Sequence, residues 1–108
     1  MKGVALRFFM HEGERHGGEL TFEWLLAEAR RTGIPGGSAF RAIAGYGRHG
    51  VLHEQTFFEL AGSLPVEVVF FTRRELANRL LASVGAAGLK LIYTVSETEF
   101  GSTGGATP

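Results

Sequence analysis

The chain has 108 residues, enough for one domain with a core of its own. It contains no cysteine, which excludes disulfide bonds, thiolate metal ligands and cysteine nucleophiles. Eleven basic and eleven acidic residues cancel, so no net charge attracts nucleic acid or an anionic membrane surface. The first apolar run is too interrupted for a signal sequence, and no run approaches a membrane span. We expect a soluble cytoplasmic protein with no nucleic-acid partner and no direct membrane insertion.

Residues 4–10 predict the first β-strand, and a central one. Every position in this run is apolar except Arg7, a pattern typical of a strand covered on both faces. Residues 11–19 follow as a polar, glycine-bearing segment with two His and three Glu, and we expect a loop there.

A helix is predicted to begin at Thr21, which has the side-chain chemistry of an N-cap. Apolar residues recur at helical spacing to about Thr32, and Gly33 is expected to end the helix. Trp24 on this helix is expected to anchor the core or an interface rather than to stack on a ligand. A glycine-rich connection then leads into a second predicted strand, residues 39–44.

The second half of the chain repeats the order strand, helix and strand. Pro65 opens a run rich in β-branched and aromatic residues, and proline at the first position of a strand costs no ladder bond. A second helix is expected over residues 73–84, capped by Thr72 with Glu75 at the capping-box spacing. Residues 89–95 then alternate along the chain and predict the fourth strand.

Two further segments carry weaker signals. Residues 51–63 are ambiguous between a short helical turn and a loop with some strand, and their apolar side chains indicate that the segment docks on the domain. Residues 101–108 have nothing to bury, so we expect a flexible C-terminal tail. The folded domain is therefore expected to span residues 1–100.

This order of elements, β-α-β followed by β-α-β, specifies an α+β fold of the ferredoxin-like type (βαββαβ). In that fold a four-stranded antiparallel sheet carries both helices on one face. The other face would expose apolar side chains, and a surface of that kind is rarely left to water. We therefore expect further copies of the chain to bury it in a closed ring. The exposed residues would be one of each pair Phe8 or Phe9, Val68 or Val69, and Leu91 or Ile92.

Two arginines stand within predicted strands, Arg7 in the first and Arg41 in the second. If adjacent strands place them on one face, they could bind an anion between subunits or pair with Glu67. We favour the ion pair, since opposite charges on neighbouring strands pair readily.

Three stretches carry a resemblance to a known family. They are Glu12 with R-H-G-G at residues 15–18, the run G-I-P-G-G-S-A-F-R-A-I-A-G-Y-G at residues 33–47, and L-P-V-E-V from Leu64. The second is the most specific, because it combines a glycine turn, a serine, an arginine in mid-strand and a terminal Gly-aromatic-Gly. On these residues the chain resembles, over residues 3–100, the DUF190 family, a branch of the PII-like signalling proteins.

The resemblance implies a homotrimer that binds an adenine nucleotide, or another small effector, in clefts between subunits. It implies no required cofactor. It also implies that the loop after the second strand docks on a protein target, such as a membrane transporter. PII proteins carry the similar motif G-F-G-R-Q, whose glycine amides and arginine fork suit a phosphate. The candidate nucleotide-binding residues are Gly37, Ser38, Gly45, Tyr46, Gly47, Arg48, Gly88 and Lys90.

The chain departs from the PII pattern at several positions. His49 stands where PII proteins have Gln, and Val66 stands where they have Lys. The C-terminal arginines that reach the phosphates have no counterpart in residues 97–108, and the segment 48–63 is shorter than a typical T-loop. These departures favour a less charged ligand, such as a mononucleotide, over a tightly bound triphosphate.

Other functions stay open on the residues alone. His49 and His53 are four apart, and His11 and His16 lie in an acidic segment, so a metal site can be imagined, although such residues are more often solvated. A metal-dependent hydrolase would require that metal. No nucleophile stands beside a base in the pattern, so we expect no enzyme activity and no catalytic or metal-binding residues. The main alternative is a trimeric adaptor that binds a protein and no small ligand.

Overall fold

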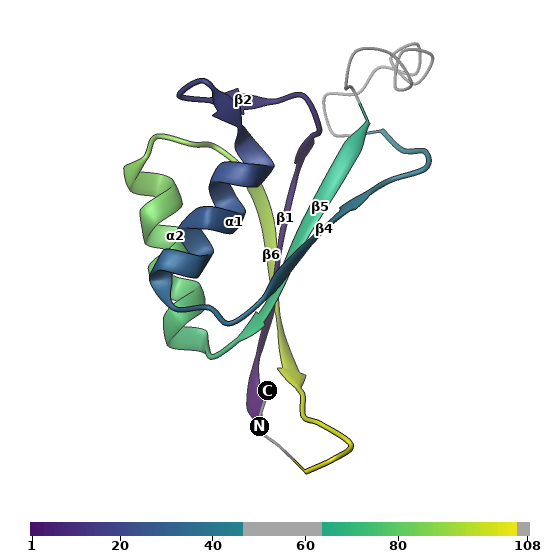
Figure 1. Cartoon of the computed structure of the whole chain (residues 1–108), viewed down its shortest axis with the longest axis vertical. Helices are drawn as coiled ribbons and strands as arrows, with labels where there is room; N and C mark the ends of the chain where they lie inside the picture. Colours follow the sequence, from purple (N-terminus) through teal and green to yellow (C-terminus); the bar gives the residue numbers. More distant parts are fainter. Residues whose placement is uncertain (47–63, 106–108) are drawn as a thin grey trace.

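The structure is a computed structural model that describes residues 1–46 and 64–105. A four-stranded antiparallel sheet has the strand order β4-β5-β1-β6, and both helices lie on one of its faces (Figure 1). This is the predicted α+β, ferredoxin-like arrangement. The elements are β1 (Lys2–His11), β2 (Arg15–His16), β3 (Glu19–Leu20), α1 (Thr21–Thr32), β4 (Gly37–Arg41), β5 (Pro65–Thr72), α2 (Arg74–Ala86) and β6 (Ile92–Glu99).

The core lies between the sheet and the two helices. β1 is central, flanked by β5 and β6, and its alternate residues turn toward the helices. Leu25 of α1 and Leu80 of α2 meet them and are fully buried. The apolar residues of this core are Val4, Leu6, Phe8, Met10, Leu25, Ala29, Ile34, Val66, Val68, Phe70, Leu76, Ala77, Leu80 and Val84.

The start of α1 differs from the prediction. Thr21 is the first helical residue and Leu20 is the N-cap, with no side-chain cap bond. The Thr21 side chain is fully buried, because its position falls on the same helix face as the buried Leu25 and Ala29. The end of the helix is as predicted: Gly33 is left-handed, with φ 104°, and its N–H donates to the carbonyl of Arg30.

The start of α2 also differs from the prediction. Thr72 is the last residue of β5 rather than a helix cap, and it is buried opposite Val4 of β1. Arg73 is the N-cap, without a side-chain cap bond, and Glu75 pairs with Arg73 at 2.8 Å. Thr72 therefore pairs within the sheet instead of capping α2, although its side chain has the chemistry of an N-cap.

Both edge strands are displaced from their predicted bounds. β4 spans Gly37–Arg41 rather than residues 39–44, because its partner β5 begins at Pro65 and offers no ladder beyond it. β6 spans Ile92–Glu99 rather than residues 89–95. The strand ends later than predicted because its polar second half pairs with the start of β1. It begins later than predicted because the N–H of Leu89 donates to the carbonyl of Val84 at the end of α2.

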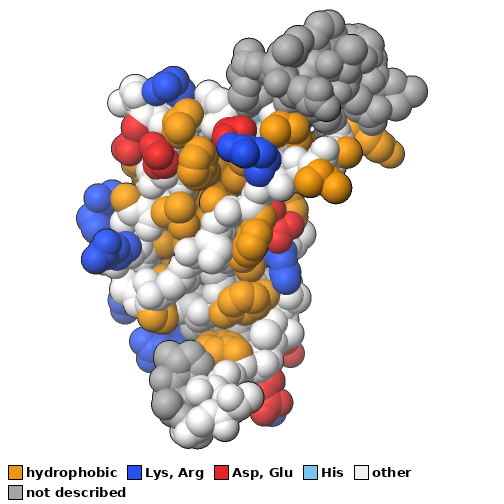
Figure 2. All heavy atoms as spheres, turned by 45° about the vertical axis from the view of Figure 1, so that its right-hand side comes forward, with side chains coloured by type: hydrophobic (Ala, Val, Ile, Leu, Met, Phe, Trp, Pro, Cys, Tyr) orange, Lys and Arg blue, Asp and Glu red, His pale blue; other side chains and the backbone are white. Residues whose placement is uncertain are grey.

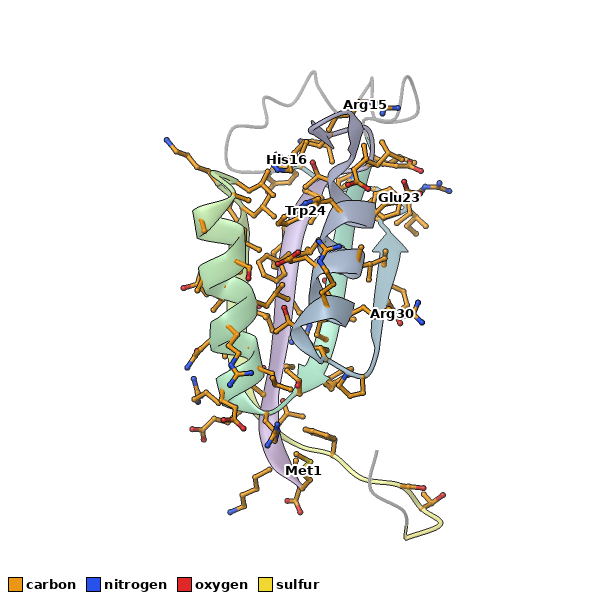
Figure 3. The ribbon with its side chains drawn as sticks, turned by 60° about the vertical axis from the view of Figure 1, so that its left-hand side comes forward. Met1, Arg15, His16, Glu23, Trp24 and Arg30 are labelled. Atoms are coloured by element: carbon orange, nitrogen blue, oxygen red, sulfur yellow. The ribbon has the colours of Figure 1, made fainter. Side chains whose placement is uncertain are left out.

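The segment between β1 and α1 is more ordered than the predicted loop. β2 and β3 form a short hairpin beside the start of α1. Figure 3 shows His16 of this hairpin beside Trp24 of α1, and their ring centroids lie 5.1 Å apart. Trp24 is half-buried against the core, as expected of an anchor.

At the other end of the sheet, Met1 and Phe100 exchange backbone hydrogen bonds of 2.9 Å. The next residues, 101–105, include a turn closed by the N–H of Gly105 and the carbonyl of Ser102. The rest of the predicted tail, residues 106–108, and the ambiguous segment 51–63 lie outside the described residues.

The face of the sheet opposite the helices is open and carries large apolar side chains, as predicted, but β6 adds the polar Thr94, Ser96 and Thr98 to it. Val69 lies on this face but is only 8% exposed, so that part of the prediction is wrong. Residues paired across antiparallel strands share a face. One row on this face therefore crosses all four strands and contains Phe40, Glu67, Phe9 and Ile92. Figure 2, with this side turned forward, shows hydrophobic side chains spread along the molecule. The large exposed ones on the open face are Phe9 (37%), Phe40 (57%), Phe71 (45%) and Ile92 (44%).

Candidate functional site

The candidate nucleotide-binding residues fall into two groups at opposite edges of the sheet. Gly37 and Ser38 begin the edge strand β4, and Gly45 and Tyr46 follow its end. Gly88 and Lys90 lie between α2 and the other edge strand, β6. With β5 and β1 between them, the two edges are about 14 Å apart at the usual strand spacing. One chain does not bring the two groups together.

Gly45 and Tyr46 of the first group nevertheless lie toward the same end of the sheet as the second group, whereas Gly37 and Ser38 lie in its middle rows. Phe40 near the end of β4 and Ile92 at the start of β6 belong to one row of paired residues. Tyr46 follows the end of β4, and Lys90 precedes the start of β6. Both residues therefore lie at the end of the sheet where β1 ends at His11. Tyr46 and Lys90 thus lie toward one end of the sheet but at its opposite edges.

Gly37 and Ser38 occupy opposite faces of β4. Gly37 is on the helix side, where it packs against Phe70 and leaves no space for a side chain. Ser38 is on the open face, in the row of Val69 and Arg7. Gly37 thus has a packing reason to be glycine, whereas the Ser38 side chain is free to contact a ligand or another copy.

Packing does not explain the residue types of Gly45 and Tyr46. Gly45 does not have a positive φ, and an added Cβ would be 3.6 Å from Cγ of Pro65, an ordinary contact. Tyr46 is 68% exposed. The described part of the chain therefore gives no packing reason for glycine at position 45 or for an aromatic at position 46. Gly47 and Arg48, the rest of this motif, lie outside the described residues.

In the second group, Gly88 has a structural reason to be glycine. Its φ of +79° is left-handed, and its N–H donates to the carbonyl of Gly85 in the turn that ends α2. Lys90 is exposed just before β6. The turn thus carries an accessible ammonium group to the edge of the sheet.

Sequence reasoning missed an ion pair beside the first group. Arg41, the last residue of β4, donates from Nε to Oε1 of Glu12 at 3.0 Å and from Nη2 to Oε2 of the same carboxylate. These hydrogen bonds lower the pKa of Glu12 and raise the pKa of Arg41. The pair bridges β5, since Glu12 follows β1 and Arg41 ends β4. The two residues are 29 apart in sequence, so no local pattern could have indicated it.

The expectation for the two strand arginines is half right. Arg7 pairs with Glu67 on the open face, with Nε and Oε2 3.4 Å apart. Arg41 does not share that face, because it is paired with Val66 on the helix side, and β5 separates its strand from β1. The one-residue alternation of the strand decides this difference.

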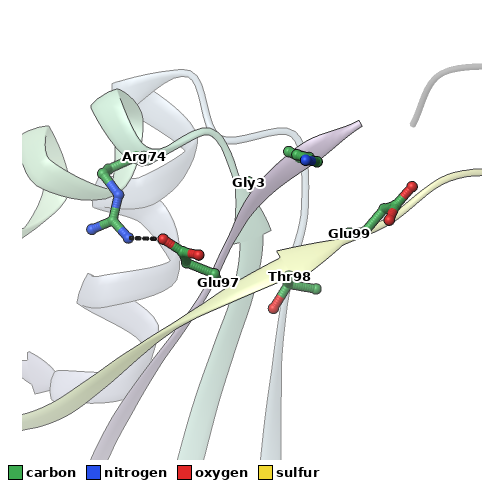
Figure 4. Close-up of a pocket in the computed structure, with 6 residues that line it drawn as sticks. Gly3, Arg74, Glu97, Thr98 and Glu99 are labelled. Atoms are coloured by element: carbon green, nitrogen blue, oxygen red, sulfur yellow. Dashed lines mark ion pairs between the residues drawn. The ribbon is translucent and has the colours of Figure 1, made fainter.

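A shallow pocket lies at the far end of the sheet, away from all these residues. Arg74 and Glu97 line it and form an ion pair of 3.9 Å (Figure 4). Lys2 and Glu99 add one charge of each sign. Its charges largely cancel, and it contains no candidate residue from the sequence.

Other chemistry was also sought in residues 1–46 and 64–105. No group of three or more His, Cys, Asp or Glu in these ranges is arranged to hold a metal ion. His49 and His53 lie outside them. Among the described helices, no helix combines the length and apolar character needed to cross a membrane.

The fold is shared with PII-like proteins. The structure of CPII, a nitrogen regulatory PII-like protein from Thiomonas intermedia K12 bound to ADP, AMP and bicarbonate, matches with a TM-score of 0.65 and 16% identity. The match covers 94% of this chain and 97% of that chain. At this identity the likeness establishes the PII-like fold.

Sequence comparison identifies the family. The model of DUF190, described as an uncharacterized ACR, matches residues 3–100, so the chain belongs to the DUF190 family. A UPF0166 protein of Aquifex aeolicus is 36% identical over 84 residues, which cover 78% of this chain and 80% of that protein. A UPF0166 protein of Methanocaldococcus jannaschii is 33% identical over 81 residues, 75% of this chain and 74% of that one.

Proposed function

We propose that this chain is a PII-like regulatory protein that binds an adenine nucleotide in clefts between the subunits of a homotrimer. The observation that carries the proposal is the division of the candidate site. Gly45 and Tyr46 lie at one edge of the sheet and Lys90 at the other, toward the same end. A neighbouring copy would supply the missing half of each cleft.

The open sheet face supports the assembly. It exposes Phe9, Phe40 and Phe71 across three strands, and burying such side chains is the main driving force for association. The face also carries the paired charges of Arg7 and Glu67, so it presents no net charge to repel another copy. A ring buries this face in every copy, whereas a monomer leaves it in water.

The nucleotide is proposed from the donors at the sheet edges and from the fold. Backbone amides around Gly45 and the ammonium of Lys90 suit a phosphate. CPII, which shares the fold, is bound to ADP and AMP. The C-terminal arginines of the PII pattern have no counterpart in residues 97–108, and this favours a mononucleotide over a triphosphate.

The output of the protein would be a change in the segment after Tyr46 that a partner protein reads. Two measurements test the proposal. Sedimentation velocity is expected to give the mass of a trimer, and a stable monomer at working concentration would overturn the assembly. Calorimetric titration with AMP, ADP, ATP and cyclic AMP is expected to detect binding of at least one of them. If none of the four binds, the proposal of an adenine nucleotide as the effector is wrong.

An adaptor without a small ligand is the second candidate function. It is favoured by Ile43, fully exposed just beyond β4, and by Tyr46, 68% exposed, which together present apolar surface to a protein. Substitution of Arg48→Ala separates the two functions. It should weaken nucleotide binding if the site holds a phosphate, and it should leave capture of a partner protein largely intact if the protein is an adaptor.

A further inference from the structure

We propose that the Arg41 guanidinium is an oxyanion-binding group of the effector site, and that the Glu12 carboxylate occupies it when no ligand is bound. This inference rests on the proposed function, because it concerns the same end of the same edge strand. The ligand group it would take is a phosphate or a small carboxylate. Glu12 is then an internal competitor for that group.

The geometry of the pair is that of a bound oxyanion. Arg41 donates from Nε and Nη2 to the two oxygens of one carboxylate. The planar guanidinium offers the same two parallel hydrogen bonds to two oxygens of a phosphate. Glu12 thus shows which atoms of Arg41 an external anion would use.

The pair is open to exchange. The Arg41 side chain is 60% exposed and that of Glu12 is 24% exposed, so a ligand can approach the guanidinium from solvent. Exposed ion pairs contribute little to stability, so releasing Glu12 costs little. Replacing one partner anion by another leaves Arg41 with its hydrogen bonds satisfied throughout.

The location connects the pair to the candidate site. The N–H of Ala42, next to Arg41, donates to the carbonyl of Pro65, and Gly45 lies beside the ring of that proline. The N–H of Glu12 donates to the carbonyl of Leu64. Backbone hydrogen bonds therefore hold Glu12 to Leu64 and the residue after Arg41 to Pro65, and a Cβ added at Gly45 would lie 3.6 Å from Cγ of that same proline.

The test is titration of the full chain with AMP and, separately, with inorganic phosphate, followed through the Nε–Hε NMR signal of Arg41. In the Glu12→Gln variant, we expect each anion to bind about two- to fivefold more tightly than in wild type, because the competing carboxylate is gone. The Glu14→Gln variant removes the same charge two residues away and should bind as wild type does. Equal tightening in both variants would overturn the proposal, since it would reflect net charge alone.

A second control addresses the ion pair itself. Arg31 and Glu28 on α1 form another exposed ion pair, in which Nε and Nη2 of Arg31 both donate to Oε1 of Glu28, and the pKa of Glu28 is likewise lowered by Arg31. Substitution of Glu28→Gln should leave both titrations unchanged. Substitution of Arg41→Gln should weaken binding, and adding Glu12→Gln to it should restore nothing. A gain from Glu12→Gln that survives without Arg41 would overturn the proposal.

The two proposals can fail separately. If AMP binds wild type but the Arg41 signal does not move with AMP or phosphate, the protein binds nucleotide by other groups and this inference is wrong. The other outcome is that no nucleotide binds, but phosphate shifts the Arg41 signal at lower concentration in Glu12→Gln than in wild type. The proposed nucleotide effector is then wrong, and the proposed role of Arg41 as an oxyanion-binding group is supported.

Discussion

Gly37 lies directly against the ring of Phe70, and a Cβ at Gly37 would stand 2.3 Å from Cε1 of that ring. Phe70 is buried in the core and cannot move aside. We expect Gly37→Ala to lower the free energy of unfolding by about 1–3 kcal/mol through overpacking. Chemical denaturation measures it. Gly36→Ala is the matched control, since a Cβ there meets nothing within 4 Å, and equal losses in both variants would contradict the packing argument.

The open face is predicted to hold the assembly together. Phe71 is 45% exposed on this face, and a carboxylate there would resist burial between copies. We expect Phe71→Glu to shift the sedimentation coefficient from that of a trimer to that of a monomer with an unchanged far-UV circular dichroism spectrum. Ala82→Glu, on the exposed side of α2, should leave the trimer intact. A trimeric Phe71→Glu variant would show that other surfaces hold the subunits.

Thr21 offers a test of helix capping. Its buried Oγ1 has no hydrogen-bond partner among the described residues. Valine has nearly the same shape and similar helix propensity, so Thr21→Val removes an unsatisfied polar group at little packing cost. We expect the free energy of unfolding to stay the same or to rise by about 1 kcal/mol. A loss of about 1 kcal/mol would instead support the cap that the sequence predicted.

Gly33, which follows the end of α1, and Gly85, within α2, are predicted to respond in opposite directions to substitution by alanine. Gly33 has φ +104°, which alanine adopts only with strain, so Gly33→Ala should lower the free energy of unfolding by about 1 kcal/mol. Gly85 lies within α2 with no positive φ and with open space around it. Gly85→Ala should therefore raise the free energy of unfolding by about 0.5–1 kcal/mol. Thermal unfolding of the two variants side by side measures both signs.

The Glu12 carboxyl is predicted to titrate below its ordinary range. The hydrogen bonds from Arg41 lower its pKa in the folded protein, whereas the Glu12 carboxyl of the unfolded chain has the ordinary pKa of about 4.5. The contribution of the pair to stability is therefore complete above that value and is lost as the pH falls through the lower, folded pKa. Carbon NMR titration of Glu12 measures this. In the Arg41→Gln variant the pKa should return upward, and an unchanged value would exclude Arg41 as the cause.

Part of the fold could be predicted because its signals are local. The apolar run of β1, the helical spacing of α1 and the left-handed glycine at position 33 each depend on neighbouring residues. The displaced edges depend on pairing with distant strands. The polar end of β6 forms a strand because it pairs with the start of β1. β4 ends at Arg41 because its partner strand, β5, begins at Pro65.

The candidate site divides in the same way. The Gly-Tyr-Gly motif, the open apolar face and the family resemblance could all be read along the chain. The contact between Glu12 and Arg41 could not, because β5 comes between their strands and enters the sheet from a later part of the chain.

By itself the sequence determined the two helices and the four strands of the main sheet, though not the bounds of the edge strands, because residue periodicity marks these segments. The open sheet face could also be expected, because two helices cover only one face. Only the tertiary structure decided which of two adjacent residues, such as Phe8 or Phe9, faces the core, because strand register depends on contacts between distant segments. The tertiary structure also decided that the two halves of the candidate site lie on opposite edges of the sheet.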